Sequence, residues 1–72
     1  MVIKMSDCVK DLFTVAVANG KLPPFFDSII YDGKSAEVIP SHGYGENSFA
    51  VKGKHDLSGK DVKFKYKGED VI

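Results

Sequence analysis

Five lysines in the C-terminal third of the chain are the side chains with the clearest potential for chemistry. They alternate with apolar residues in two short runs and are Lys52, Lys54, Lys63, Lys65 and Lys67. Ammonium groups gathered on one surface attract phosphates or the carboxylates of an acidic protein. Lysines on the solvent side of a sheet also protect strand edges from aggregation, so solvation alone is the competing interpretation.

An aromatic side chain near these lysines is a second candidate. Tyr44 stands between Gly43 and Gly45 in the polar stretch 41–47, which predicts a loop. An exposed tyrosine there could stack on a base or enter a pocket of a partner, while the competing interpretation has it fold back on the core. We therefore predict the five lysines and Tyr44 as partner-binding residues.

Metal binding and catalysis are not expected. The only soft ligand types are Cys8, His42 and His55, and their spacing matches no known zinc pattern. Any chain offers some set of nucleophile, base and carboxylate, and only geometry makes these a catalytic site. We predict no enzymatic activity, no metal site and no cofactor.

The charge composition favours a protein partner over nucleic acid. All ten basic residues are lysine, and the net charge is +0. Residues 50–67 carry six lysines against two aspartates, a local charge of +4, and the remainder carries −4. Arginine supplies the planar fork that reads phosphates and guanine edges, and it is absent. A lysine-rich, arginine-free chain is also typical of AT-rich genomes, such as those of many phages and mobile elements.

The two runs that carry the lysines predict strands. They span 48–55 and 61–67, and polar residues alternate with apolar residues in both. Alternation with a period of two places the apolar side chains on one face of a sheet. The inward residues are Phe49, Val51, Val62, Phe64 and Tyr66.

A connection at 57–60 would pair these runs as a hairpin. That register sets Lys54 opposite Lys63 and Lys52 opposite Lys65, so the five ammonium groups emerge together. Like charges placed opposite one another cost about 0.2–1 kcal/mol per pair, which is an argument for a binding role.

The N-terminal part predicts a helix over residues 7–18. Ser6 is a suitable N-cap, and Asn19-Gly20 with the prolines that follow supplies a stop. The apolar residues recur with helical spacing and are Cys8, Val9, Leu12, Phe13 and Ala16.

Two interpretations of residues 24–31 stay open. The spacing of the apolar residues suits a short helix, whereas Asp32-Gly33 followed by 34–39 is a strong signal for a two-residue hairpin. The hairpin is slightly favoured, and in both cases a strand at 35–39 ends at Pro40.

These elements predict an α+β fold. One N-terminal helix packs on an antiparallel sheet of three to four strands, with Val9, Leu12, Phe13 and Ala16 facing the inward residues of the two runs. A small SH3-like barrel with an appended helix is the main variant, and a winged-helix arrangement is a weaker one.

The size and composition predict one small domain. A chain of 72 residues buries about 60% of its unfolded surface, so its stability is marginal or aided by self-association. The segment MVIKMSDC lacks a secretory signal pattern, no apolar run is long enough for a membrane span, and a single cysteine suits the cytoplasm.

We therefore expect a non-catalytic binding module that docks on an acidic protein through its lysine face, such as an accessory or inhibitor protein of a phage or mobile element. One alternative is a weak, sequence-independent nucleic-acid binder that uses the same face. Another is a structural or assembly subunit whose sheet edges pair between copies, as in a homo-oligomer.

Overall fold

All the regular secondary structure in the described residues consists of β-strands. The computed structural model of the protein describes residues 2–43 and 47–71, without the side chains of residues 40–43. Its strands are β1 (Val2–Lys10), β2 (Phe13–Ala18), β3 (Ser28–Tyr31), β4 (Lys34–Gly43), β5 (Ser48–Lys52), β6 (Asp61–Tyr66) and β7 (Glu69–Asp70). The predicted α+β class is wrong, since these described ranges contain no helix, and both variants that include helices fail with it.

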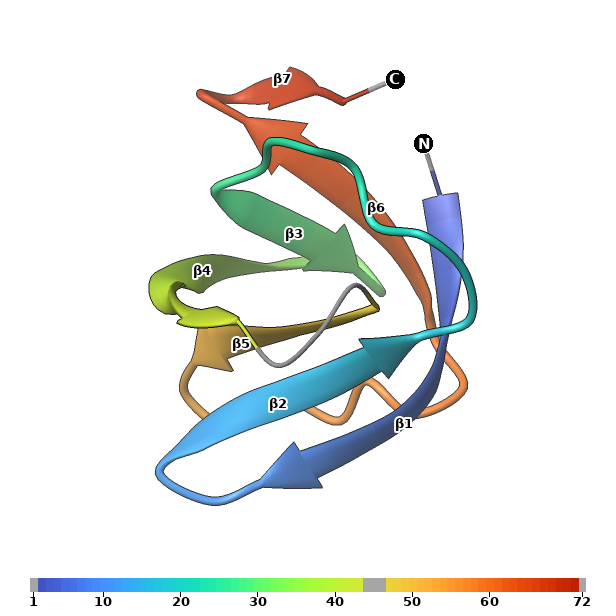
Figure 1. The fold of residues 1–72 in the computed structure, drawn as a ribbon, viewed down its shortest axis with the longest axis vertical. Helices are drawn as coiled ribbons and strands as arrows, with labels where there is room; N and C mark the ends of the chain where they lie inside the picture. Colours follow the sequence, from blue (N-terminus) through green and yellow to red (C-terminus); the bar gives the residue numbers. More distant parts are fainter. Residues whose placement is uncertain (1, 44–46, 72) are drawn as a thin grey trace.

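The strands form one antiparallel sheet that closes on itself. Their order is β1-β2-β5-β4-β3-β6-β7, and β1 also pairs with β6. The additional pairing joins the first six strands of this order into a ring, and β7 remains as a short flap on β6 (Figure 1). Closure pairs backbone groups that an open sheet would leave at its edges.

Two long strands divide the ring into two halves. β1 pairs with β6 through residues 2–4 and with β2 from Met5 onward, and its register shifts between Met5 and Asp7. β4 pairs with β3 up to Glu37 and with β5 from Val38. Such shifts let a strand bend and pass between two packed layers. The first half contains β3, β6 and β7, the second contains β2 and β5, and β1 and β4 belong to both.

The core lies between the halves and includes side chains from two connections. Phe49 of β5 and Phe64 of β6 meet edge to face with ring centroids 5.6 Å apart. From the connection 19–27, Phe26 places its ring 5.4 Å from that of Phe49 and 4.9 Å from that of Phe64. Leu57, from the connection between β5 and β6, is fully buried. Both connections are therefore structural parts of the core.

The predicted helix over residues 7–18 is wrong, because this stretch contains the end of β1, a turn and β2. A helix would bury Val9 and Leu12, yet these side chains are 64% and 87% exposed. In β2 the buried residues alternate instead, as Thr14 and Ala16 show with 0% exposure each. β-Branched residues crowd this segment and fit a pleated strand better than a helix.

The two lysine-bearing runs form β5 and β6, but these strands do not pair with each other. β5 lies between β2 and β4, and β6 lies between β1 and β3. The predicted hairpin and its register are therefore wrong. The turn at 57–60 exists, since the Lys60 N–H donates to the Leu57 carbonyl (3.1 Å) and Gly59 has a φ of 73°. It lies within a connection that crosses from the second half to the first.

The hairpin predicted at Asp32-Gly33 is confirmed. Tyr31 pairs with Lys34, and both turn residues have positive φ, 49° for Asp32 and 75° for Gly33, as a two-residue turn of type I′ requires. The predicted end of the next strand at Pro40 is wrong, because β4 continues to Gly43.

A buried hydroxyl ties the connection 53–60 to the sheet. Thr14 Oγ1 donates to the Gly53 carbonyl (2.8 Å) and accepts from the His55 N–H (2.8 Å). The His55 ring lies 2.7 Å from the Tyr31 hydroxyl at Nδ1 and 3.0 Å from the Lys52 carbonyl at Nε2. Because a carbonyl oxygen only accepts, Nε2 donates, and in the neutral ring Nδ1 accepts the tyrosine proton.

The Tyr31 hydroxyl remains a donor into the alkaline range. Burial raises the pKa of Tyr31 above its usual 10.0, and the carboxylates of Asp32 and Asp56 raise it further, against the opposing charge of Lys60. Lys60 in turn forms an ion pair with Asp32 (2.7 Å), and this contact raises the pKa of the Lys60 ammonium group.

Replacing Thr14 with valine keeps the shape of the side chain but removes both hydrogen bonds of its hydroxyl. Since an unsatisfied buried group costs about 1–3 kcal/mol, we expect Thr14→Val to lower the free energy of unfolding by about 2–4 kcal/mol. Thr14→Ser keeps the hydroxyl and is expected to cost about 1 kcal/mol for the lost methyl group. Urea unfolding followed by circular dichroism measures both, and equal losses would contradict the proposed role of the hydroxyl.

Candidate binding surface

The structure brings three of the five predicted lysines together near the β6–β7 turn. Lys63 and Lys65 lie on the outer side of β6, and Lys67 is the first of the two residues between β6 and β7. Lys52 ends β5 in the second half of the ring, and Lys54 lies in the connection that follows it. The lysines therefore do not form one continuous face.

A cross-strand row of opposite charges links Lys65 with Lys52. Lys65 pairs with Asp70 on β7 and with Ser28 on β3, and Ser28 pairs with Glu37 on β4. The Lys65 Nζ lies 2.8 Å from the Asp70 Oδ1, and the Lys52 Nζ lies 2.7 Å from the Glu37 Oε2. This alternation neutralises much of the positive charge that the sequence places here.

The Asp70 carboxylate serves two lysines. Lys65 donates a hydrogen bond to it, and the Lys63 Nζ lies 3.8 Å from its other oxygen. The hydrogen bond from Lys65 holds the pKa of Asp70 below its usual 3.8, and both ammonium charges lower it further. The ammonium groups of Lys63 and Lys65 therefore share one carboxylate on the outer side of β6.

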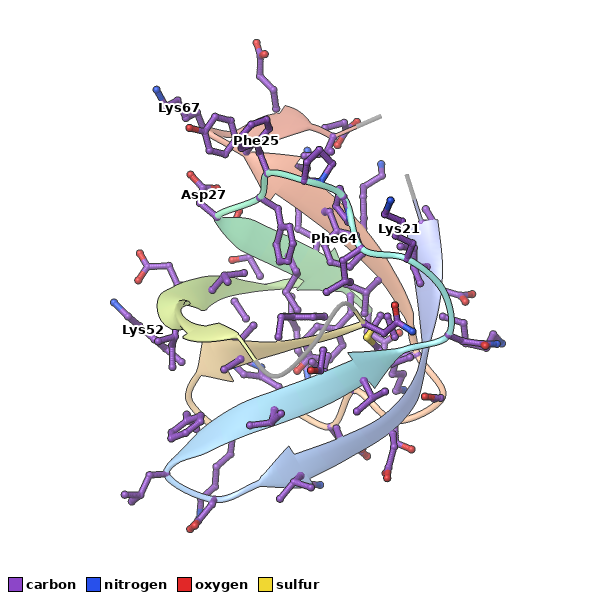
Figure 2. The ribbon with its side chains drawn as sticks, in the orientation of Figure 1. Lys21, Phe25, Asp27, Lys52, Phe64 and Lys67 are labelled. Carbon is purple, nitrogen blue, oxygen red and sulfur yellow. The ribbon has the colours of Figure 1, made fainter. Side chains whose placement is uncertain are left out.

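Two exposed aromatic rings adjoin these lysines. Phe25 is 68% exposed and Tyr66 is 42% exposed, and their ring centroids lie 6.1 Å apart. The Lys67 Nζ lies 5.5 Å from the centroid of the Tyr66 ring, within the range of a cation–π contact. Phe25, Tyr66 and Lys67 are named the aromatic–lysine patch. Figure 2 shows Phe25 and Lys67 at the same end of the molecule.

Phe25 faces solvent because its neighbour is anchored in the core. The ring of Phe26 packs edge to face on that of Phe64, as described above. Pro24 precedes Phe25 and restricts the backbone, and Phe25 lies in a connection without regular structure. Burial of one phenylalanine therefore directs the other outward.

Asp27 fixes the position of this connection on β6. Its N–H donates to the Lys65 carbonyl (2.9 Å), and its own carbonyl accepts from the Val38 N–H (3.0 Å). Its carboxylate accepts from the N–H of Lys67 (3.1 Å), a residue with a φ of 51°. One aspartate thus holds both segments that form the aromatic–lysine patch, and such preorganisation lowers the entropy cost of binding.

A hollow of about 430 Å³ lies beside Asp27. It is open to solvent and is lined by Asp27, Ser28, Glu37, Val38 and Lys52, which supply carboxylate, hydroxyl and ammonium groups beside the apolar Val38. Figure 2 shows Asp27 and Lys52 on the same side of the molecule as Lys67. The hollow therefore extends the surface from the aromatic–lysine patch toward β5 and supplies polar groups of both charges.

Metal-ligating side chains do not cluster in the part of the chain that the structure describes, where no group of three or more His, Cys, Asp and Glu could hold an ion. The Cys8 Sγ lies 4.0 Å from the His55 carbonyl oxygen, a weak hydrogen bond, and the His55 ring contacts Tyr31. The side chain of His42 lies outside those described. The expected lack of enzymatic activity stays a prediction.

No family model matches the chain, and no curated protein and no solved structure matches it. Across residues 2–43 and 47–71, no helix has the length and apolar character needed to cross a membrane. The aromatic–lysine patch is therefore interpreted from its own chemistry.

Sequence reasoning missed Phe25 and Tyr66. The alternation along β6 predicts an inward Tyr66, but this residue ends the strand, and its ring lies against Phe25. The available signal was the proline pair at 23–24, which marks a stiff, extended segment before two phenylalanines. Tyr44 lies outside the described residues, so its role in binding stays a prediction.

The ion pairs of Asp70 predict a stability term that depends on pH. Because its pKa is lowered in the folded protein, the stabilisation is complete above the usual value of 3.8 and is lost as the pH falls through the lowered pKa. We expect Asp70→Asn to be less stable than the wild type at pH 6 and to converge with it toward about pH 2. Urea unfolding midpoints across this range test the convergence.

Glu69→Gln is the matched control for this measurement. Glu69 is exposed, adjoins Asp70 and makes no ion pair with any described residue. Its substitution removes the same charge without breaking a contact to Lys63 or Lys65. A difference between Asp70→Asn and the wild type that is the same at both ends of the pH range would contradict the assigned ion pairs.

Proposed function

We propose that the protein is a non-catalytic binding module that docks on an acidic protein through the aromatic–lysine patch. The exposure of Phe25 beside Tyr66 is the observation that carries this proposal. Aromatic side chains dominate the energetics of protein interfaces, because each removes a large area from water at little cost in conformational entropy. Here the two rings are already fixed by the anchoring of Phe26 and Asp27.

The lysines indicate the chemistry of the partner. The Lys67 ammonium group contacts the Tyr66 ring and has no carboxylate partner in the described part of the chain. Lys63 and Lys65 share a single carboxylate. A partner with an apolar recess beside one or two carboxylates matches both the rings and these ammonium groups, and such charge pairs add specificity to the contact.

Nucleic acid fits this surface less well. The acidic residues Asp27, Glu69 and Asp70 lie next to the three lysines of the β6–β7 region. Three negative charges balance three positive ones, whereas a phosphate backbone requires a surplus of positive charge. Exposed rings alone could stack on bases, and that outcome is included in the test.

Removing the two rings tests the proposal. A tagged protein and its Phe25→Ser/Tyr66→Ser variant are used to capture partners from a lysate of the source cells, with products identified by mass spectrometry. Loss of a hot-spot side chain typically costs about 2 kcal/mol or more, so we expect recovery of the partner to fall at least about 30-fold. Lys67→Glu is also expected to lower recovery of the partner, and by a larger factor in low salt than in high salt.

Leu12→Ser is the matched control, because Leu12 is 87% exposed but lies in the turn between β1 and β2. Recovery by this variant should equal that of the wild type. Equal recovery by the double variant would refute the patch as the docking site. A shift of generic single-stranded DNA that the double variant abolishes would favour the nucleic-acid alternative instead.

A further inference from the structure

The outer face of the second half of the ring is apolar. Val9 on β1 pairs with Val15 on β2, and Val15 pairs with Ala50 on β5, which gives an uninterrupted apolar row across three strands. Phe13 and Val17 extend it along β2 on either side of Val15. The apolar outer face is defined as Val9, Phe13, Val15 and Val17, because Ala50 at the end of the row is fully buried.

Side chains of this face do not belong to the core. Val9 is 64% exposed and Val17 is 38% exposed, whereas the alternate residues Thr14 and Ala16 are fully buried. Outward positions of the first half carry the charged and polar row that includes Lys65 and its partners. A sheet face that is meant only for solvent normally carries polar residues, as the first half does. The second half therefore has the composition of a face that another surface covers.

We propose that this face binds a second copy of the chain in a symmetric dimer. A two-fold axis parallel to β2 would stack Phe13, Val15 and Val17 on their own copies. It would also place β1 of one molecule opposite β5 of the other, so that the exposed Val9 lies over β5 of the second copy. An isologous interface requires such a self-complementary surface.

The charges on the two borders of the face select a second copy over other occupants. The β1 border carries Asp7 and Asp11. The β5 border carries Lys54 and Lys52, and Lys52 also forms an ion pair with Glu37 (2.7 Å), which leaves this border with one excess positive charge. Lys52 pairs in register with Phe13, and the Asp11 N–H donates to the carbonyl of the same Phe13 (3.0 Å), so Asp11 and Lys52 lie at the same level of the face.

The proposed axis brings the acidic border against the basic border twice, once on each side. A partner of a single charge sign would match one border and be repelled by the other, because like charges in contact destabilise an interface. The dimer face also lies on elements other than those of the aromatic–lysine patch, which is built from the connection 19–27 and the end of β6. Both surfaces can therefore be occupied together.

The size of the face predicts a weak dimer. Three strands spaced about 4.8 Å apart and about six residues long cover on the order of 300 Å². Stable interfaces bury about 800 Å² per partner, so this contact falls in the class of weak, transient associations. We expect a dissociation constant of about 10 µM to 1 mM.

Sedimentation equilibrium of the purified chain from about 10 µM to 2 mM tests the proposal. The wild type should change from monomer toward dimer over this range, and Val9→Lys should weaken the association at least tenfold. Val2→Lys is the matched control, because Val2 is also an exposed valine, at 58%, but lies on the part of β1 that pairs with β6. It should associate as the wild type does.

Two further measurements locate the interface. Asp11→Lys should also weaken association, because it sets a lysine against Lys52, and added salt should reduce that difference. Dilution should shift the amide resonances of Val9, Val15 and Val17 while leaving those of β6 unchanged. A chain that stays monomeric at 2 mM, a Val9→Lys variant that associates like the wild type, or shifts confined to β6 and β7 would each overturn the proposal. None of these results affects the capture experiment with Phe25 and Tyr66.

Discussion

The bends of β1 and β4 are the constraint on which the rest of the molecule depends. Each strand pairs with one half of the ring at its start and with the other half at its end. A flat sheet of this size could bury one face only, whereas two bent strands wrap the sheet around its own side chains. β7 pairs with the end of β6 beyond the residues that pair with β1 and is the last strand in the order, and the aromatic–lysine patch lies beside it.

A small closed sheet also needs covers at its open ends, and the connections provide them. Leu57 and Phe26 complete the core from segments that have no regular structure. Polar side chains then fasten both covers: Thr14 and Tyr31 hold the connection 53–60, and Asp27 holds the connection 19–27. Because the covers are fixed in this way, Phe25 has a defined position on the surface rather than that of a loose loop.

Local patterns in the sequence predicted strands well and pairing poorly. Alternation identified β5 and β6, and Asp32-Gly33 identified the turn after β3, because each signal depends on a few adjacent residues. The prediction of a helix over residues 7–18 is wrong because the apolar residues around Leu12 fit the period of a helix as well as that of a strand. No glycine or proline marks the turn between β1 and β2. Partners of β5 and β6 depend on contacts across the whole chain, which no local pattern encodes. The expectation that the five lysines emerge together depended on the pairing of β5 with β6, and this pairing does not occur.

Closure of β1 on β6 also sets the order of events when the chain is synthesised. The hairpins β1–β2 and β3–β4 join neighbouring segments and can form as soon as each has left the ribosome. The ring cannot close until residues 61–63 emerge to pair with residues 2–4. Until that moment the nascent protein exposes open strand edges and the inner faces of both hairpins, so this ring is completed only after residue 63 has left the ribosome.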